Sequence, residues 1–382
     1  MLSRDKDMQR IKLMTWTGFI LLWMLCSCNN PSASLPVVDF SCDNLRLDSV
    51  ELAFIPLETS SKCLLSSIED VSFYNKRIFV NDIQCKGIYA FTDSGHFIGQ
   101  IGKYGNGPGE YLMAKRFYID TVSQKLTAMD FSQSKMIDYD LKSYQYLSSH
   151  KANVLTDCTW LPDGNMAWFD LSGYENTKRK HFYVNITDQN LKSLRYGFET
   201  KLTTGYLLSL GKRFFENDNH HYLAAQFNPI AYEVSTDTIK PVYQVSFGQY
   251  KFPPADWLST HINEDDNYLP SLFKSPYICA FNLNETSDYL LATFLIHGNQ
   301  DYYAIYNKKS KHSRIYTNKE FCHLLGINGL NTIIGTYNNY FVCSLSTALL
   351  KRSQSIGRAD LRNIANKLSE EDNPIICMFK FQ

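Results

Sequence analysis

The chain has 382 residues and a formal net charge of zero, because 38 Lys and Arg residues balance 38 Asp and Glu residues. With no basic patch in the sequence, this balance argues against a nucleic-acid-binding protein. The chain is longer than one ordinary hydrophobic core covers, yet no Pro/Ser-rich linker or run of charges divides it. A repeat architecture explains both properties, because such a fold grows by adding units.

The first residues have the pattern of an export signal. Basic side chains at the start precede a mostly apolar run, residues 13–25, that is too short to span a bilayer stably. The run ends in Leu25-Cys26-Ser27-Cys28, which resembles the bacterial lipobox, in which the cysteine becomes the lipidated N-terminus. We therefore predict a signal peptide over residues 1–27 and acylation of Cys28. The alternative is an uncleaved N-terminal membrane anchor.

Residues 28–49 are predicted to be the lipidated N-terminus and a tether. The residue after the lipidated cysteine is Asn29 and not Asp, which by resemblance to lipoprotein sorting rules favours the outer membrane. No acidic cluster follows Cys28, and the sequence leaves open whether the protein faces the periplasm or the cell surface. The membrane, reached through the lipid anchor, is thus the first expected partner.

The remaining cysteines do not form a recognisable site. Of the 10 cysteines, eight follow Cys28, with no C-x-x-C pair and no zinc-ligand spacing. Four of them lie in strand-like runs and are expected to be small buried hydrophobic residues rather than disulfide partners: Cys85, Cys279, Cys343 and Cys377.

Short strand-like runs begin at residue 50. In chain order the first of them cover residues 50–57, 68–71, 77–82, 88–91 and 96–101. Asp93-Ser94-Gly95 lies between the last two runs and has the composition of a tight turn. Residues 102–109 contain four glycines and a proline, so they are predicted to form a shaped loop rather than a strand or helix.

The pattern then repeats at a near-constant interval. The turn residues of successive units are Asp93, Asp140, Asp188 and Asp237. They are 47, 48 and 49 residues apart, and each lies between two strand-like runs. Asp82 and Asp130, which end equivalent runs, are also 48 residues apart. A period of this size, with several short strands in each unit, is typical of propeller blades.

The last two units depart from this interval. Residues 249–276 are interpreted as an inserted loop with one helical turn, and long insertions on repeat folds are often functional. Within residues 356–370, apolar side chains at i, i+3, i+4 and i+7 predict an amphipathic helix. The chain ends in a strand over residues 374–381. We expect this strand to share a blade with residues 50–57, because an open ring would leave two unpaired sheet edges.

Residues 101–111 (Ile-Gly-Lys-Tyr-Gly-Asn-Gly-Pro-Gly-Glu-Tyr) resemble the signature loop of the lipid-anchored six-bladed β-propellers of anaerobic Gram-negative bacteria, a family similar to NHL-repeat propellers. Phe54-Ile55-Pro56-Leu57-Glu58, Asp120 and Asp372-Asn373-Pro374 agree with that family. The resemblance spans about residues 50–382. It implies an all-β fold, a six-bladed β-propeller of four-stranded antiparallel blades, with one C-terminal helix inserted in the last blade. It also implies a cell-envelope location, but no catalytic residues.

Common catalytic signatures are absent from the sequence. It contains no G-x-S-x-G, no H-E-x-x-H and no paired-carboxylate motif. The Gly-rich loop lacks the Gly-Lys-Ser/Thr ending of a phosphate-binding P-loop, and no helix follows it. We therefore interpret it as a crossing between blades, with Lys103 and Glu110 bonded across it. No cofactor is expected.

Histidines offer one weak metal-site hypothesis. His220 and His221 are adjacent, with Asp218 nearby, and His297 ends an apolar run. Neighbouring residues in a strand point to opposite faces and chelate a single ion poorly. Polar residues at strand ends are therefore the favoured interpretation, and no metal is assigned.

Binding is expected in the loops that depart from the repeat. Residues 249–276 contain Trp257 and Tyr268, and the Gly-rich crossing contains Lys103 and Tyr104; these four are the candidate binding residues. We expect a non-enzymatic binding or scaffolding propeller whose partner is an unidentified envelope protein, peptide or glycan. The alternative is an envelope hydrolase or lyase that acts on peptide or glycan in the central channel, with the three histidines as metal ligands.

Overall fold

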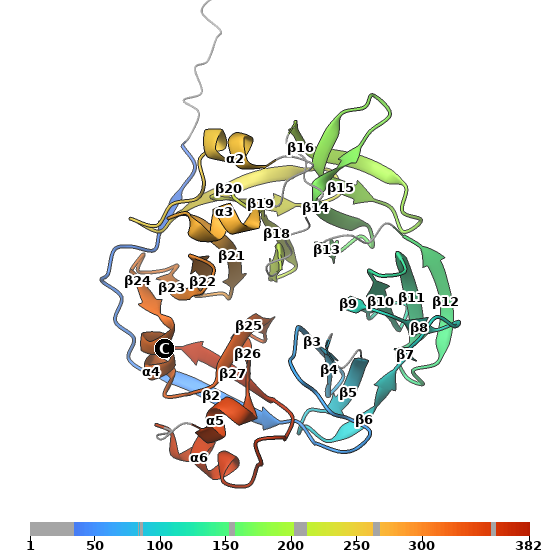
Figure 1. Ribbon diagram of the computed structural model, residues 1–382, viewed down its shortest axis with the longest axis vertical. Helices are drawn as coiled ribbons and strands as arrows, with labels where there is room; N and C mark the ends of the chain where they lie inside the picture. The colour runs from blue at the N-terminus through green and yellow to red at the C-terminus, as the bar shows by residue number, and fades with distance from the viewer. Residues whose placement is uncertain are drawn as a thin grey trace, which may run out of the picture. The chain divides into compact units, whose positions relative to one another are not determined.

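The computed structural model describes residues 34–82, 84, 87–152, 157–201, 212–262, 268–352 and 357–382. The predicted signal peptide and the lipidation site Cys28 lie outside these residues, as does Cys85. Val37–Gln382 form one compact unit, in which six sheets of four or five strands surround a central axis (Figure 1). The predicted six-bladed β-propeller is confirmed.

Each blade has four main strands, and the first of them lies next to the axis. The inner strands of blades 1 to 6 are β3 (Asp70–Tyr74), β9 (Ala114–Asp120), β13 (Asp157–Trp160), β17 (Phe214–Asn217), β21 (Ile278–Glu285) and β25 (Leu330–Tyr337). The second strands are β4 (Arg77–Asp82), β10 (Lys125–Asp130), β14 (Met166–Glu175), β18 (His220–Ala224), β22 (Tyr289–Ile296) and β26 (Tyr340–Leu345). The third strands are β5 (Gly87–Thr92), β11 (Lys135–Asp140), β15 (His181–Thr187), β19 (Ile230–Val234), β23 (Gln300–Asn307) and β27 (Ile375–Phe381). The outer strands are β6 (Phe97–Ile101), β12 (Tyr146–Lys151), β16 (Ser193–Thr200), β20 (Ile239–Ser246), β24 (Ser313–Thr317) and β2 (Val50–Pro56).

The hydrophobic core consists of layers between neighbouring blades. Successive side chains of a strand alternate between its two faces, so each blade packs on both of its neighbours. In β4, Phe79 joins Leu126 of blade 2, whereas Ile78 and Val80 join Ile376 of blade 6. Similar clusters lie at the other four blade interfaces. This packing explains why the second and third strands are apolar on both faces.

The ring closes through strands from the two ends of the propeller. β2 pairs with β27 in antiparallel register, from Val50 opposite Phe381 to Pro56 opposite Ile375. The outer strand of blade 6 therefore comes from the beginning of the propeller sequence, and its other three strands come from the end. The predicted closure between residues 50–57 and 374–381 is confirmed.

Buried aspartates hold the segments that lead into the first two blades. Asp130 ends β10 and is fully buried, and its carboxylate accepts the backbone N–H groups of Leu112 at 2.8 Å and Met113 at 3.2 Å. Asp82 ends β4 and likewise accepts the N–H groups of Ser66 and Ser67. The 48-residue spacing of the two aspartates thus reflects an equivalent clamp in each blade.

The Gly-rich loop connects β6 of blade 1 to β9 of blade 2, as interpreted from the sequence. Its β7 (Lys103–Tyr104) and β8 (Glu110–Tyr111) form a short parallel pair. The Glu110 carboxylate lies so close to Gly105 that a Cβ atom there would be 2.1 Å from Oε2. The same carboxylate accepts the Gly107 N–H at 2.8 Å and pairs with Lys103 Nζ at 3.7 Å. The predicted contact between Lys103 and Glu110 is therefore confirmed.

The segment expected to be a tether is partly built into the ring. β1 (Val37–Asp39) pairs in parallel with β20 and becomes a fifth strand of blade 4. The N–H groups of Asn44 and Leu45 then donate to the carbonyl of Ser313 on β24 of blade 5. Leu45 is buried in the cluster between blades 5 and 6. We call residues 37–49 the strap, because they cross the outer edges of blades 4 and 5 before β2 begins (Figure 1).

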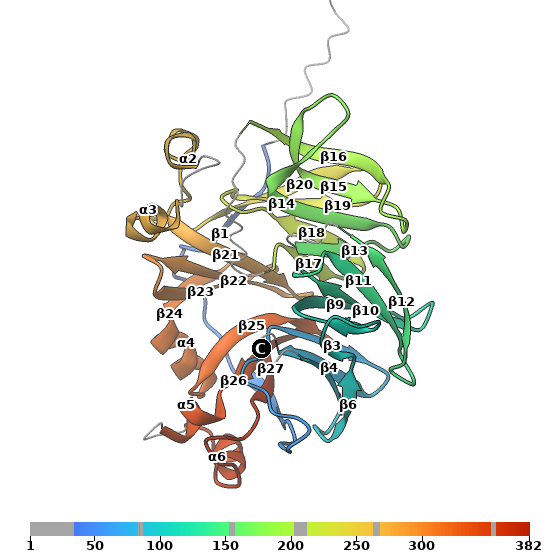
Figure 2. The ribbon, with the colours of Figure 1, turned by 45° about the vertical axis from the view of Figure 1, so that its right-hand side comes forward.

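Five helices decorate the described part of the ring. The insertion 249–276 contains α2 (Ala255–His261) and α3 (Leu269–Lys274) rather than one helical turn. α4 (Asn318–Leu325) joins blade 5 to blade 6 and begins with a capping box between Thr317 and Glu320, which the sequence prediction missed. The last blade carries α5 (Thr347–Arg352) and α6 (Ala359–Ala365) instead of the single expected helix (Figure 2). None of the helices in the described residues is long and apolar enough to cross a membrane.

The aspartate clamp can be tested in Asp130→Ala. This substitution leaves several buried N–H groups without an acceptor, and we expect it to lower the free energy of unfolding by about 2–4 kcal/mol. Chemical denaturation of the purified protein measures the effect. Asp140→Ala, in a solvent-exposed turn of the same blade, is the matched control and should cause a much smaller loss. Equal losses in the two variants would contradict the clamp.

Candidate ligand site in the central channel

The six inner strands line a cavity of about 370 Å³ on the axis of the ring. This volume lies within the usual range for small-molecule sites. Every blade contributes lining residues, among them Asp70, Arg116, Asp157, Glu216, Asn284 and Gly335. The cavity is therefore a property of the closed ring and not of any single blade.

Asp157 connects three blades at the wall of this cavity. It is 5% exposed and lies at the start of β13 in blade 3. Its carboxylate accepts the backbone N–H groups of Arg213 and Phe214, which lead into blade 4. Its other oxygen lies 3.3 Å from Nε of Arg116 on β9 of blade 2. Each of these three partners is an N–H donor, so the carboxylate is held in place from two neighbouring blades.

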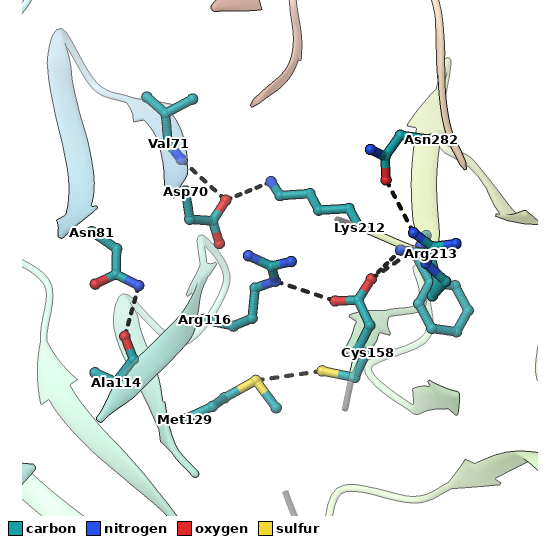
Figure 3. A network of polar contacts seen from close by, with 12 residues as sticks. Asp70, Val71, Asn81, Ala114, Arg116, Met129, Cys158, Lys212, Arg213 and Asn282 are labelled. Atoms are coloured by element: carbon teal, nitrogen blue, oxygen red, sulfur yellow. Dashed lines mark hydrogen bonds and ion pairs between the residues drawn. The ribbon is translucent and has the colours of Figure 1, made fainter. Parts of the chain in front are cut away.

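A second ion pair joins blades that face each other across the channel. Lys212 immediately precedes blade 4, and its Nζ lies 2.5 Å from Oδ1 of Asp70 on β3 of blade 1. The Asp70 side chain is 8% exposed, and that of Lys212 is 33% exposed. In a six-membered ring blade 1 lies opposite blade 4, so this pair crosses the channel (Figure 3).

Arg116 is the central cation of the cavity. Burial disfavours its charged form, but the carboxylates of Asp157 and Asp70 outweigh this and raise the pKa of the guanidinium. The side chain is 11% exposed, and Nε is bonded to Asp157. Among the described residues, no hydrogen-bond acceptor is found for Nη1 and Nη2. A buried guanidinium thus turns its terminal donors toward the cavity.

Arg213 fixes the segment that carries Lys212. Its guanidinium donates to Oε1 of Gln226 at 2.7 Å and to Oδ1 of Asn282, on β21, at 3.1 Å. Burial lowers the pKa of Arg213 to about 10, so the side chain is still charged at neutral pH. The amide of Gln226 in turn donates to the carbonyl of Cys279. Lys212 therefore projects into the channel from a base held by blades 4 and 5.

An aromatic pair also lines the cavity. Tyr118 of β9 and Trp160 of β13 stack with ring centroids 4.1 Å apart and an angle of 2° between the planes. Burial raises the pKa of Tyr118 to about 12, so the phenol is neutral. The cavity thus combines these ionic side chains, which come from blades 1 to 4, with a flat, largely apolar surface at the interface of blades 2 and 3.

The candidate binding residues from the sequence lie away from this cavity. Lys103 and Tyr104 are exposed on β7. Trp257 is half-buried and stacks on His261 within α2, at a centroid distance of 4.0 Å. Tyr268 is only 2% exposed and packs against Phe227, which corrects its expected role as a surface recognition residue. Binding by Trp257, Lys103 and Tyr104 stays a prediction.

The three histidines point to different partners. His220 Nδ1 lies 2.6 Å from Glu233, whereas His221 Nδ1 lies 3.2 Å from the Thr159 hydroxyl. His297 is in the turn after β22, in another blade. Across the residues that the structure describes, no group of three or more His, Cys, Asp or Glu is arranged to hold a metal ion.

The charged residues of the channel were not singled out from the sequence. A signal for them exists, because Asp70, Arg116 and Asp157 are charged residues at or near the start of the first strand of their units. Sequence position could have suggested that they face the axis, but not which of them meet.

Comparison with known proteins supports the fold and finds a similar protein that is predicted to be exported. A family profile described as a 6-bladed beta-propeller, DUF5128, matches residues 27–344. The crystal structure of a Bacteroides fragilis protein predicted to be exported is similar, with a TM-score of 0.84 and 26% identity over 91% of this chain and 99% of that one. A DUF4221 member from Bacteroides vulgatus has a TM-score of 0.49 and 8% identity, covering 88% of this chain and 99% of that one. No curated protein matches the sequence. The resemblance to NHL-repeat propellers stays a prediction.

Lys115, next to Arg116, should make stability depend on pH. Burial, followed by the charge of Arg116, lowers the pKa of Lys115 from 10.5 to about 8. Between pH 8 and pH 10.5 the unfolded chain therefore binds more protons at this group than the folded chain does. The contribution of Lys115 to the free energy of unfolding consequently rises with pH in this range. Lys115→Met should therefore be more stable than the original protein at pH 7, by about 1–3 kcal/mol. We expect the difference to shrink by pH 10 in denaturation experiments; a constant difference would contradict the buried charge.

Proposed function

The chain belongs to the DUF5128 family of six-bladed β-propellers, and on that premise we propose that it is an exported envelope protein that binds a ligand in its central channel. The observation that supports this proposal most directly is the ionic cluster of Asp70, Arg116, Asp157 and Lys212, drawn from four blades into one cavity. Binding sites on rigid scaffolds use a few fixed polar groups of this kind in a concave pocket.

Binding accounts for these residues better than the alternative hydrolase or lyase activity. The cavity contains one thiol, Cys158, among its lining residues. Burial raises the pKa of this thiol well above its usual value, and its sulfur lies 3.4 Å from that of Met129, so it is not an activated nucleophile. The arginine and lysine donors are suited to hold an anion, and a scaffold of fixed ion pairs suits recognition without a chemical step.

The lipid anchor at Cys28 forms part of the same proposal. It is supported by the lipobox-like Leu25-Cys26-Ser27-Cys28 and by the similarity to a protein predicted to be exported. Anchoring in the outer membrane would keep the channel within reach of envelope peptides and glycans, the partners expected from the sequence. Dual acylation gives stable membrane attachment without a transmembrane helix.

The anchor is tested by Cys28→Ala in the producing bacterium. We expect the variant to leave the membrane pellet and enter the soluble fraction, because the only predicted lipid-acceptor residue is gone. Fractionation with immunodetection measures the shift, and Cys42→Ala is the matched control that should stay with the membrane. Continued membrane retention of Cys28→Ala would contradict anchoring through this residue.

Channel binding is tested by filling the cavity with Gly335→Phe. Gly335 lines the cavity, and a Cβ atom added there meets no atom within 4 Å, so a larger side chain can enter the channel without displacing the backbone. We expect the original protein to retain a bound molecule in native mass spectrometry after incubation with a digest of envelope peptides and glycans. The Gly335→Phe variant should lose that mass.

Gln100→Phe, on the exposed outer strand β6, serves as the control and should keep the bound molecule. Retention by Gly335→Phe, or no bound molecule on the original protein, would refute channel binding. Cleaved fragments that appear with the original protein but not with Gly335→Phe would instead favour the hydrolase or lyase alternative.

A further inference from the structure

We propose that the channel recognises a carboxylate group, which takes the position of Asp70 opposite Arg116 and Lys212. This inference rests on the proposed function, because it names the chemical class of ligand that the channel accepts. Its basis is the different degree to which the four residues of the ionic cluster, Asp70, Arg116, Asp157 and Lys212, are already engaged by other groups. Glu216 also lines the cavity, but its side chain is 71% exposed and lies outside this cluster.

Arg116 supplies the first half of the recognition. Its Nε is engaged by Asp157 at 3.3 Å, which fixes the plane of the guanidinium. Nη1 and Nη2 have no acceptor among the described residues, although the side chain is only 11% exposed. The two terminal nitrogens are not among the side-chain atoms that are buried without a partner, so they are open to the cavity. The planar fork of arginine fits the two oxygens of a carboxylate. The open donors of Arg116 are therefore a site for an acceptor that comes from outside the chain.

Lys212 supplies the second half. Its ammonium group can donate three hydrogen bonds, and within the described residues it makes one, to Asp70. It is also the most accessible member of the cluster, with 33% of its side chain exposed. Lys212 can thus contact an entering ligand before any other contact is broken.

The two carboxylates of the ionic cluster differ in how firmly they are held. Asp157 accepts two backbone N–H groups as well as Arg116, so moving it would uncouple blades 2, 3 and 4. Within the described residues, the Asp70 carboxylate accepts hydrogen bonds only from Lys212 and from the N–H of its own neighbour Val71, and it interacts with Arg116 through charge. Asp70 is therefore the carboxylate that a ligand can replace.

Charge balance favours a carboxylate over a doubly charged phosphate. Asp70 stays in the cavity when a ligand takes over its contact with Lys212. A bound carboxylate therefore adds one negative charge near Asp70 and Asp157, whereas a phosphate dianion adds two. The two cations, Arg116 and Lys212, accommodate the single charge better. The stacked pair of Tyr118 and Trp160 adds a flat wall on which the body of the ligand can lie.

Asp70→Asn provides the decisive variant, because it removes the internal competitor and leaves both cations. The probes are N-acetyl-Ala-Ala with a free carboxyl terminus and galacturonic acid. Their neutral counterparts are N-acetyl-Ala-Ala amide and galactose, and inorganic phosphate is the third kind of probe. We expect at least one carboxylate probe to bind Asp70→Asn about tenfold more tightly than the original protein in titration calorimetry, while its neutral counterpart does not gain. The identity of the probe that gains tells whether a peptide terminus or an acidic sugar is the source.

Two further variants separate recognition from a structural effect. Asp138→Asn breaks another buried Asp–Lys pair, in which Asp138 lies 3.6 Å from Lys125 in blade 2, and it should not change the affinity for any probe. Arg116→Lys in the Asp70→Asn background keeps the charge but loses the fork, and it should abolish the gain.

Equal binding of a carboxylate and its neutral counterpart, no gain in Asp70→Asn, or a larger gain for phosphate would each overturn the carboxylate assignment. None of these results would contradict the proposed function, which is tested separately by comparing the original protein with Gly335→Phe.

Discussion

The alternation of side chains between the two faces of a strand is the constraint on which this ring depends. A blade has no interior of its own, because the side chains of β4 divide between blade 2 and blade 6, and the other central strands are likewise apolar on both faces. Every apolar face is covered only while both neighbours are present. The pairing of β2 with β27 is therefore more than one sheet contact, since it completes the blade that covers both blade 5 and blade 1.

The polar site depends on the same arrangement. Asp157 holds amides of one neighbouring blade and the guanidinium of the other, so its position is defined only when three blades are in place. Arg213 is fixed by Gln226 and Asn282, which belong to blades 4 and 5. The geometry of the channel is thus set by the packing of strands rather than by flexible loops, which is the condition for a preorganised site.

Much of the fold could be predicted, because a blade is a local pattern that recurs along the chain. The candidate site could not, since its contacts have no period: Asp70 and Lys212 are 142 residues apart, and Arg116 and Asp157 are 41 apart. Such contacts arise only from the closure of the ring. Tyr268 was misjudged for a related reason, because an aromatic residue in an insertion looks the same in sequence whether its helix packs against the blade or away from it.

The use of β2 as the last strand of blade 6 also governs when the protein can fold. The ribosome makes a chain from its N-terminus, so residues 50–56 emerge long before their partners at 375–381. Until synthesis has released the final strand, β2 has no partner, and the outer edge of β26 is open as well. Contacts between such distant segments form slowly, and unpaired edges invite association with other chains. Synthesis from the N-terminus therefore produces an obligatory open intermediate, in which β2 and β26 each have an unpaired edge until the final strand arrives.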